Sequence, residues 1–272
     1  MCIMSILYRK EIRNIIRAKI YEGSFGSVGL KGSSSSAGGV SGSDSSSSSD
    51  GSSDTGQSLS AGEGLEKLMP STLSAAVPEI SKECALYALS SFRKHYANGR
   101  IKNNKKILIV DYTIPGNKTR LWCIEIDSSG KILLRVASDV AHGSGNGAKG
   151  NAVPTTFSNT EGTHASSVGA FVSAGSYKSN AGMPKKYPGG RPYGGLSRRI
   201  KGLDPTNSRD YPRAIVIHGA WYRENGQTGR SWGCLATAAE TNKKIVDFLG
   251  VGTFGYKFGG KSNAAKVDTS WA

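Results

Sequence analysis

The sequence has no long run of apolar residues. No window approaches the ~20 consecutive apolar residues that a transmembrane helix requires. Near the N-terminus, the longest apolar run is also shorter than the ~7 to 15 residues of a secretory signal. The sequence therefore predicts no membrane-spanning helix and shows no recognisable signal peptide.

Cysteine is also scarce, and the four cysteines lie far apart at positions 2, 84, 123 and 234. No two of them form a C-x-x-C pair, so their spacing suggests neither a zinc site nor a redox pair, and nothing else in the chain predicts a metal or a cofactor. Cys84 and Cys123 lie in helix-like and strand-like segments and are expected to be buried small hydrophobic residues. Cys234 differs, because its glycine-rich and polar surroundings have no regular periodicity.

Apolar residues make up 37% of the chain, which is low for a fully folded protein. Residues 32–60 are almost entirely Ser, Gly and Asp, and such a tract cannot offset about 1 to 2 kcal/mol of backbone entropy per ordered residue. We therefore predict a disordered Ser/Gly-rich linker over residues 23–64, a folded domain over 65–260 and a C-terminal tail over 261–272.

The charge of +15 predicts an anionic partner, although it is equally compatible with a role in solubility alone. There is no zinc-finger spacing and no RNP-type aromatic motif, so nucleic acid is not the expected partner. Residues 1–22 interleave isoleucines with Arg and Lys every three to four positions, which predicts a basic amphipathic leader. An anionic membrane or a wall polymer is the partner that this charge favours.

The apolar pattern predicts a mainly β domain with a helix packed at one side. The helix is expected over residues 71–97, with its regular part starting near Pro78 and its end at Asn98-Gly99. Three strand-like runs separated by short Gly- or Asn-containing turns predict an antiparallel meander over 105–114, 120–126 and 131–140. Further strands are expected over 168–173, 213–218 and 253–258, with long loops over 142–166 and 175–212.

One histidine and one cysteine have a spacing that suits nucleophilic catalysis. The run from Arg213 to His218 predicts a buried strand that ends at the imidazole, and Cys234 follows sixteen positions later, far enough for the chain to fold back. A thiolate is the reactive form of cysteine, and an adjacent imidazolium lowers the pKa of the thiol from about 8.5. Gly233 would let the backbone approach a substrate carbonyl, where amide N–H groups could stabilise an oxyanion.

These residues resemble the signature of the YkuD-type L,D-transpeptidases of the bacterial cell wall, which is His-Gly, some 14 to 17 residues, then Ser-x-Gly-Cys. Here it reads His218-Gly219 followed by Ser231-Trp232-Gly233-Cys234. Further runs resemble the murein branch of the family: Val140 to Gly145, Phe157-Ser158-Asn159, Ser166 to Gly169 and Gly229 to Cys234. The resemblance covers roughly residues 75–260.

The resemblance implies an L,D-transpeptidase-like β-sandwich with flanking helices and a peptidoglycan substrate. Cys234 would attack the amide between the third residue of a tetrapeptide stem and the following D-alanine, releasing D-alanine. An amine of a neighbouring stem would resolve the acyl-enzyme to form a 3→3 cross-link. Water would instead give the tripeptide of an L,D-carboxypeptidase, which could be delivered to another cell as a wall-attacking effector. By the same resemblance His218 is the base, the carbonyl of Gly219 orients it, and the protein acts in the periplasm or cell envelope.

Six residues are expected at the substrate site: Ser231, Gly233, Trp232, Arg230, His142 and Ser167. His142 either faces the substrate or caps a glycine turn, Trp232 either stacks on substrate or packs, and Ser167 either contacts substrate or forms a tight turn. His95 and His164 are predicted to be surface residues. A non-catalytic wall-binding module is a further alternative, although the paired Cys234 and His218 argue against it. The sequence makes no prediction of the oligomeric state.

Overall fold

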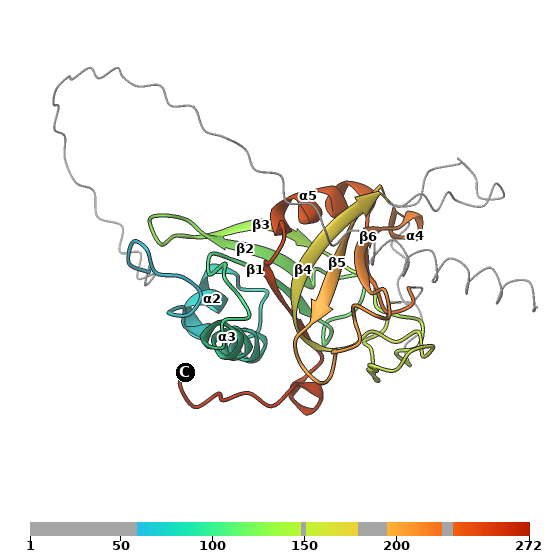
Figure 1. Ribbon diagram of the computed structural model, residues 1–272, viewed down its shortest axis with the longest axis horizontal. Coiled ribbons are helices and arrows are strands. Elements are labelled where there is room, and N and C mark those ends of the chain that lie inside the picture. Colours follow the sequence, from blue (N-terminus) through green and yellow to red (C-terminus); the bar gives the residue numbers. More distant parts are fainter. Residues whose placement is uncertain (1–58, 148–150, 179–194, 225–230) are drawn as a thin grey trace, which may run out of the picture. The chain divides into compact units, whose positions relative to one another are not determined.

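The computed structural model describes residues 59–147, 151–178, 195–224 and 231–272 (Figure 1). The predicted leader, nearly all of the predicted linker and Arg230 lie outside these ranges. Within them, eight strands form one sheet and short helices flank it, so the prediction of a mainly β fold with flanking helices is confirmed. None of the helices in these ranges is long and apolar enough to cross a membrane.

The helical part near the N-terminal end of the domain is made of two helices, α2 (Pro70–Ala76) and α3 (Lys82–Ala97). The prediction of one helix from residue 71 to 97 is therefore wrong between them. Val77 is the C-cap of α2, and Pro78 has no N–H with which to continue it. Ser81 then caps α3 by accepting a hydrogen bond from the backbone N of Cys84. The predicted end at Asn98-Gly99 is confirmed.

The eight strands form a mixed sheet in the order β3-β2-β1-β8-β4-β5-β6-β7. The predicted meander is confirmed, because β1 and β3 both pair antiparallel with β2. Two neighbouring pairs, β1–β8 and β6–β7, are parallel. The bounds are β1 (Lys106–Asp111), β2 (Leu121–Ile126), β3 (Ile132–Ser138), β4 (Gly169–Lys178), β5 (Leu196–Gly202), β6 (Val216–Gly219), β7 (Leu235–Thr237) and β8 (Phe254–Phe258).

Several elements were not predicted from the sequence. Strand β5 lies in the segment that was expected to be a long loop over 175–212. Helix α5 (Ala239–Leu249) follows β7 and buries Ile245, Val246 and Leu249. The short helix α4 (Trp221–Glu224) follows β6, and a 3-10 turn, η1 (Lys261–Asn263), follows β8.

The sheet has a hydrophobic core on each face, because successive residues of a strand point to opposite sides. Ile107 and Ile109 pack in a core with α2 and α3, whereas Leu108 and Val110 pack in a second core with α5. Strands from both halves of the sheet, β1 and β2 as well as β5, β6 and β7, contribute to this second core. The sheet therefore encloses the second core as the two layers of a sandwich do.

His95 corrects the prediction of a surface residue, since only 2% of it is exposed. Its Nε2 lies 2.9 Å from Oδ1 of Asp204, in the segment after β5. The other oxygen of Asp204 accepts a hydrogen bond of 2.7 Å from the backbone N of Ala170 in β4. The pair therefore ties α3 to the sheet through two buried polar contacts.

The His95–Asp204 contact predicts an acid-sensitive contribution to stability. Burial opposes the ionisation of Asp204, but hydrogen bonds from His95 and from the backbone of Ala170 outweigh it and lower the pKa of Asp204. A lowered carboxyl pKa contributes stability that is present above the unfolded-state pKa and is lost as the pH falls through the folded-state pKa. We expect Asp204→Asn to lower the free energy of unfolding by about 1 to 3 kcal/mol at neutral pH.

The same substitution should also weaken the loss of stability on acidification below about pH 4, because the amide side chain of the variant cannot take up the proton. Denaturant unfolding of both proteins across this pH range measures the two effects. Asp247→Asn is the control, since Asp247 is an exposed carboxylate that pairs with Lys243 at the surface. An acid dependence identical to that of the unsubstituted protein would contradict the assignment.

Candidate active site

The parallel pairing of β6 and β7 brings His218 and Cys234 to neighbouring strands. His218 lies opposite Ala236, and Ile217 lies opposite Leu235. Cys234 directly precedes β7, so the same register puts it beside Val216, two positions before His218. The pairing therefore brings Cys234 and His218 to adjacent strands, within two positions of each other in the register.

The imidazole of His218 is oriented by the backbone of the next residue. Its Nδ1 lies 2.9 Å from the carbonyl oxygen of Gly219. A carbonyl oxygen only accepts hydrogen bonds, so Nδ1 carries the proton and Nε2 is the basic nitrogen of the neutral ring. Burial lowers the pKa of His218, and the hydrogen bond to Gly219 opposes this only in part. The imidazole is therefore neutral at neutral pH, as a general base must be.

The thiol of Cys234 is partly buried, and its Sγ lies 3.9 Å from the carbonyl oxygen of Ala214. Burial raises the pKa of Cys234, and a hydrogen bond with the backbone of Val216 opposes the rise. The raised thiol pKa and the lowered imidazole pKa both favour a neutral thiol and a neutral imidazole over a thiolate and an imidazolium.

The turn before Cys234 requires glycine and is closed by a serine. Gly233 has a φ of +102°, and a Cβ there would lie 2.7 Å from the carbonyl oxygen of Ala165. Ser231 donates a hydrogen bond of 2.8 Å from its Oγ to the carbonyl oxygen of Cys234. Ser231 is buried, and its own carbonyl accepts a hydrogen bond from the backbone N of Ser144. Both residues therefore shape the turn that presents the thiol.

Trp232 is the exposed aromatic residue of the motif, with 45% of its surface accessible. Its ring stacks on that of His164, with centroids 4.8 Å apart and planes 11° apart. His164 has a φ of +55°, a left-handed conformation that is uncommon for residues other than glycine. The predicted surface histidine thus forms, with Trp232, a flat aromatic surface two residues from the thiol, which sequence reasoning missed.

His142 and Ser167 lie in the interior and not at a substrate surface. His142 is fully buried, and its Nδ1 accepts a hydrogen bond of 2.9 Å from Nη2 of Arg120. Arg120 is itself fully buried and also donates to the carbonyl oxygens of Val140 and Ile114. Burial lowers the pKa of Arg120 to about 10, so the guanidinium stays charged at neutral pH.

Ser167 belongs to a buried charged cluster that the sequence did not reveal. Lys257, in the central strand β8, donates a hydrogen bond of 2.8 Å to Oγ of Ser167 and lies 2.6 Å from Oδ2 of Asp210. Ser167 in turn donates to Oδ1 of Asp210 at 2.5 Å. The side chains of Lys257 and Asp210 are both fully buried. In the sequence Phe-Gly-Tyr-Lys-Phe, Lys257 gave no signal beyond that of an outward-facing strand residue.

This cluster supports the loop that faces the thiol. The carbonyl oxygen of Asp210 accepts a hydrogen bond from the backbone N of Ile215, which closes residues 210–215 into a loop. Arg213 in this loop donates to the carbonyl oxygens of Ser158 and Ala165. The next residue, Ala214, has a φ of +56° and presents its carbonyl to Cys234. The buried ion pair therefore anchors a backbone segment that contacts Cys234.

Comparison with known proteins gives a match to the family described as L,D-transpeptidase catalytic domain over residues 76–258. A search of curated proteins found no significant match. Similar solved structures include the L,D-transpeptidase from Mycobacterium smegmatis, with 13% identity over 56% of this chain and 58% of that chain and a TM-score of 0.33.

Two further solved structures have comparable similarity. L,D-transpeptidase 1 of Mycobacterium tuberculosis has 12% identity over 57% of this chain and 62% of its own, with a TM-score of 0.31. A variant of the Enterococcus faecium L,D-transpeptidase has 15% identity over 57% of this chain and 50% of its own, with a TM-score of 0.33. The chain thus spans between 50% and 62% of the length of these three proteins. The family match itself extends over more than half of the chain, and the chain belongs to the L,D-transpeptidase catalytic domain family.

Proposed function

We propose that this chain is a peptidoglycan L,D-transpeptidase in which Cys234 is the nucleophile and His218 the general base. The observation that carries the proposal is the parallel β6–β7 pairing, which brings Cys234 and His218 to adjacent strands, while the carbonyl of Gly219 accepts a hydrogen bond from the imidazole. A thiol, a base and a group that orients the base are the three parts that nucleophilic catalysis needs. The substrate is a tetrapeptide stem, whose location implies action in the periplasm or cell envelope.

The reaction begins from the neutral pair. As Sγ of Cys234 attacks the carbonyl carbon between the third residue and D-alanine, Nε2 of His218 takes the thiol proton. The imidazolium then gives this proton to the nitrogen of the leaving D-alanine, and a thioester remains. The backbone N–H groups of Gly233 and Cys234 are the candidate donors to the tetrahedral oxyanion.

The second half of the reaction decides the product. An amine from a neighbouring stem gives its proton to His218 and attacks the thioester, which forms a 3→3 cross-link and regenerates the thiol. If water attacks instead, the product is a tripeptide and the protein is an L,D-carboxypeptidase. The aromatic surface of Trp232 and His164 beside the thiol supports substrate binding there.

Incubation with purified tetrapeptide muropeptides, followed by mass spectrometry, tests the proposal. Cross-linked dimers together with free D-alanine are the expected products. Tripeptides alone would show that the protein acts as an L,D-carboxypeptidase and not as a transpeptidase. Binding without any product would indicate a non-catalytic wall-binding module and refute both enzymatic activities.

Substitution of the two proposed catalytic residues should abolish turnover without unfolding the domain. Cys234 is partly exposed, so Cys234→Ala removes a nucleophile and little core volume. We expect less than about 1% of the original activity for Cys234→Ala and a comparable loss for His218→Ala. The double variant should be no worse than either single one, because the two residues act as a unit.

Product formation and circular dichroism on the same samples measure these effects. Cys84→Ala is the control, since Cys84 is a fully buried residue of α3 in the other core. A double variant much slower than both single variants would show that Cys234 and His218 act independently.

A carbapenem should form one covalent adduct with the protein. Its strained β-lactam carbonyl is an acyl donor, and the thiol of Cys234 would open the ring and become acylated. Cys84 and Cys123 are fully buried, and burial raises the pKa of each thiol, so neither should react. Intact-mass analysis should show a single adduct that is absent in Cys234→Ala. An adduct mapped to Cys84 or Cys123 would exclude Cys234 from the role proposed here.

The buried charges near Cys234 should shift its thiol pKa in opposite directions. Charged or titratable side chains that interact electrostatically with the thiol are Asp210, Arg213, Lys257, Tyr112 and Tyr177. Asp210 raises the pKa of Cys234 and Lys257 lowers it. Asp210→Asn should therefore lower the thiol pKa, Lys257→Met should raise it, and the double variant should fall between them.

The pH dependence of Cys234 alkylation by iodoacetamide reports these shifts, with mass spectrometry confirming the site of reaction. Ser167→Ala is the matched control, because it removes a member of the cluster while keeping both charges. Shifts of the same sign in Asp210→Asn and Lys257→Met would mean that the cluster acts through structure alone.

A further inference from the structure

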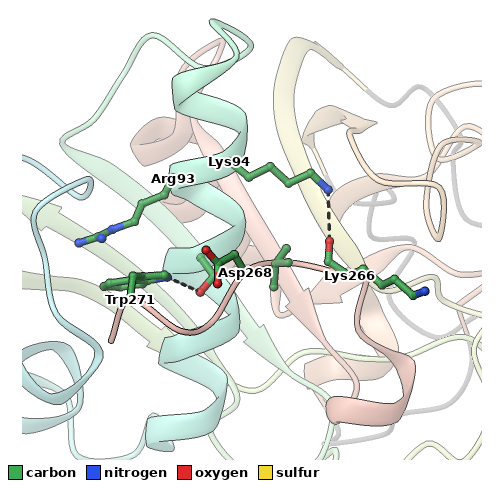
Figure 2. A pocket seen from close by; sticks show the side chains of 7 residues that line it. Arg93, Lys94, Lys266, Asp268 and Trp271 are labelled. Carbon is green, nitrogen blue, oxygen red and sulfur yellow. Dashed lines mark hydrogen bonds between the residues drawn. The ribbon is translucent and has the colours of Figure 1, made fainter.

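A pocket of about 610 Å³ lies between α3 and the segment that follows η1, and we name it the α3 pocket (Figure 2). The residues that line it are Ser90, Arg93 and Lys94 from α3, and Lys266, Val267, Asp268 and Trp271 from the C-terminal segment. The sequence predicts a C-terminal tail over residues 261–272. In the structure it lies against the helix and forms one wall of the pocket.

The C-terminal segment is attached to α3 at two points. Lys94 donates a hydrogen bond of 3.3 Å from Nζ to the carbonyl oxygen of Lys266, and Trp271 donates one of 2.8 Å from Nε1 to Oγ of Ser90 (Figure 2). The guanidinium of Arg93 lies over the ring of Trp271, 3.3 Å from its centroid. These contacts hold the C-terminal segment against α3.

The α3 pocket carries an excess of positive charge. Three of its side chains are cationic, and within the described ranges no carboxylate lies at ion-pair distance from Arg93, Lys94 or Lys266. Asp268 is the single acidic residue of the lining, and its Oδ1 already accepts hydrogen bonds from the backbone N and the Oγ of Ser270. The pocket therefore favours an anionic ligand.

Arg93 is arranged to bind a carboxylate. Its Nε is buried and has no hydrogen-bond partner within the described ranges. Stacking on Trp271 fixes the plane of the guanidinium, so its N–H groups form a rigid fork that matches the two oxygens of a carboxylate. Trp271 and Val267 add apolar surface, which suits a ligand with alkyl groups better than a hydrophilic phosphate polymer.

The α3 pocket is separate from the site of Cys234. Trp271 packs against the core on the α2 and α3 face of the sheet, whereas Cys234 packs against the core on the opposite face. Figure 1 likewise shows α3 and the C-terminus away from β6 and α4. A ligand in this pocket would therefore leave the thiol accessible.

We propose that the α3 pocket binds a carboxylate-bearing stem peptide of peptidoglycan, independently of the stem that reacts at Cys234. The substrate class rests on the function proposed above. A volume of about 610 Å³ falls within the range of small-ligand sites, so it accommodates a short peptide. Two sites on one chain raise the effective concentration of the wall polymer at the thiol.

The four tryptophan indole N–H groups provide the test, because Trp271 lines the α3 pocket and Trp232 lies beside Cys234. We suggest recording their NMR signals in the isotope-labelled full chain carrying Cys234→Ala, which prevents turnover, during titration with a tetrapeptide muropeptide. Signals are assigned with Trp271→Phe and Trp232→Phe. Trp122, which is fully buried, serves as the internal reference.

The expected result is a saturable shift of the Trp271 signal. Lys94→Gln/Lys266→Gln should raise the muropeptide Kd measured at the Trp271 signal about tenfold or more, because charge-assisted contacts are lost. Arg93→Lys should raise this Kd as well, because the substitution keeps the charge but removes the fork of guanidinium N–H groups. Lys118→Gln/Lys131→Gln, two exposed lysines outside the pocket, is the control of equal charge and should leave the Kd unchanged. The Trp271 signal of each free variant shows whether the C-terminal segment stays attached.

Three results would overturn the proposal: no shift of the Trp271 signal, an equal Kd loss in the control variant, or an equally strong response to glycerol phosphate or inorganic phosphate. The two proposed functions fail independently. A shift of the Trp271 signal without a shift of the Trp232 signal would support binding in the α3 pocket and argue against the catalytic site. A shift of the Trp232 signal alone would support the catalytic site and refute binding in the α3 pocket.

Discussion

The arrangement of the site depends on the parallel pairing of β6 with β7. Parallel neighbours cannot be joined by a tight turn, so the chain must cross over between Gly219 and Leu235. Only three residue pairs define the register. A slip by one residue would turn every side chain of β7 to the opposite face and shift Cys234 relative to His218, because side chains alternate along a strand. The proposed chemistry therefore depends on a short strand pairing whose register must be stabilised by contacts with other segments.

Contacts on the far side of β7 provide that fixation. Ala141 bridges to Ala236, and Gly143 bridges to Ser231 at the start of the turn that holds the thiol. Ser166 connects the same elements, since its Oγ accepts from the backbone N of Gly143 and donates to the carbonyl oxygen of Gly233. The segment that follows β3 thus lies against β7 at the other end of the sheet order. The register of these bridges limits how far β7 can shift along β6.

Buried arginines hold the long loops around the site in the same way, since Arg120 and Arg213 each donate to two backbone carbonyl oxygens that no strand partner satisfies.

Sequence reasoning identified the parts of the fold that have a local signal. The meander is visible because its apolar runs and Gly- or Asn-containing turns are consecutive, and the His-Gly and Ser-x-Gly-Cys runs are visible because their spacing is characteristic. Strand β5 has no such signal, since Leu196–Gly202 contains two arginines and a lysine. The structure makes this composition possible because Arg198 is buried and donates to the carbonyl oxygens of Ala174 and Val246. Lys257 also has no local signal in the sequence, because its partner Asp210 lies 47 residues away.

The resemblance located the functional region more reliably than the direction of individual side chains. His142 and Ser167 belong to runs that resemble the family, yet both point into the interior and bind Arg120, Asp210 or Lys257. A motif records that a residue is near the site, whereas burial and hydrogen bonding decide whether it meets the substrate or supports the residues that do. The same distinction applies to Cys234. Burial raises the pKa of its thiol and lowers the pKa of the His218 imidazole, so in the proposed reaction the proton transfer that generates the thiolate accompanies the attack and depends on how Sγ and Nε2 are aligned.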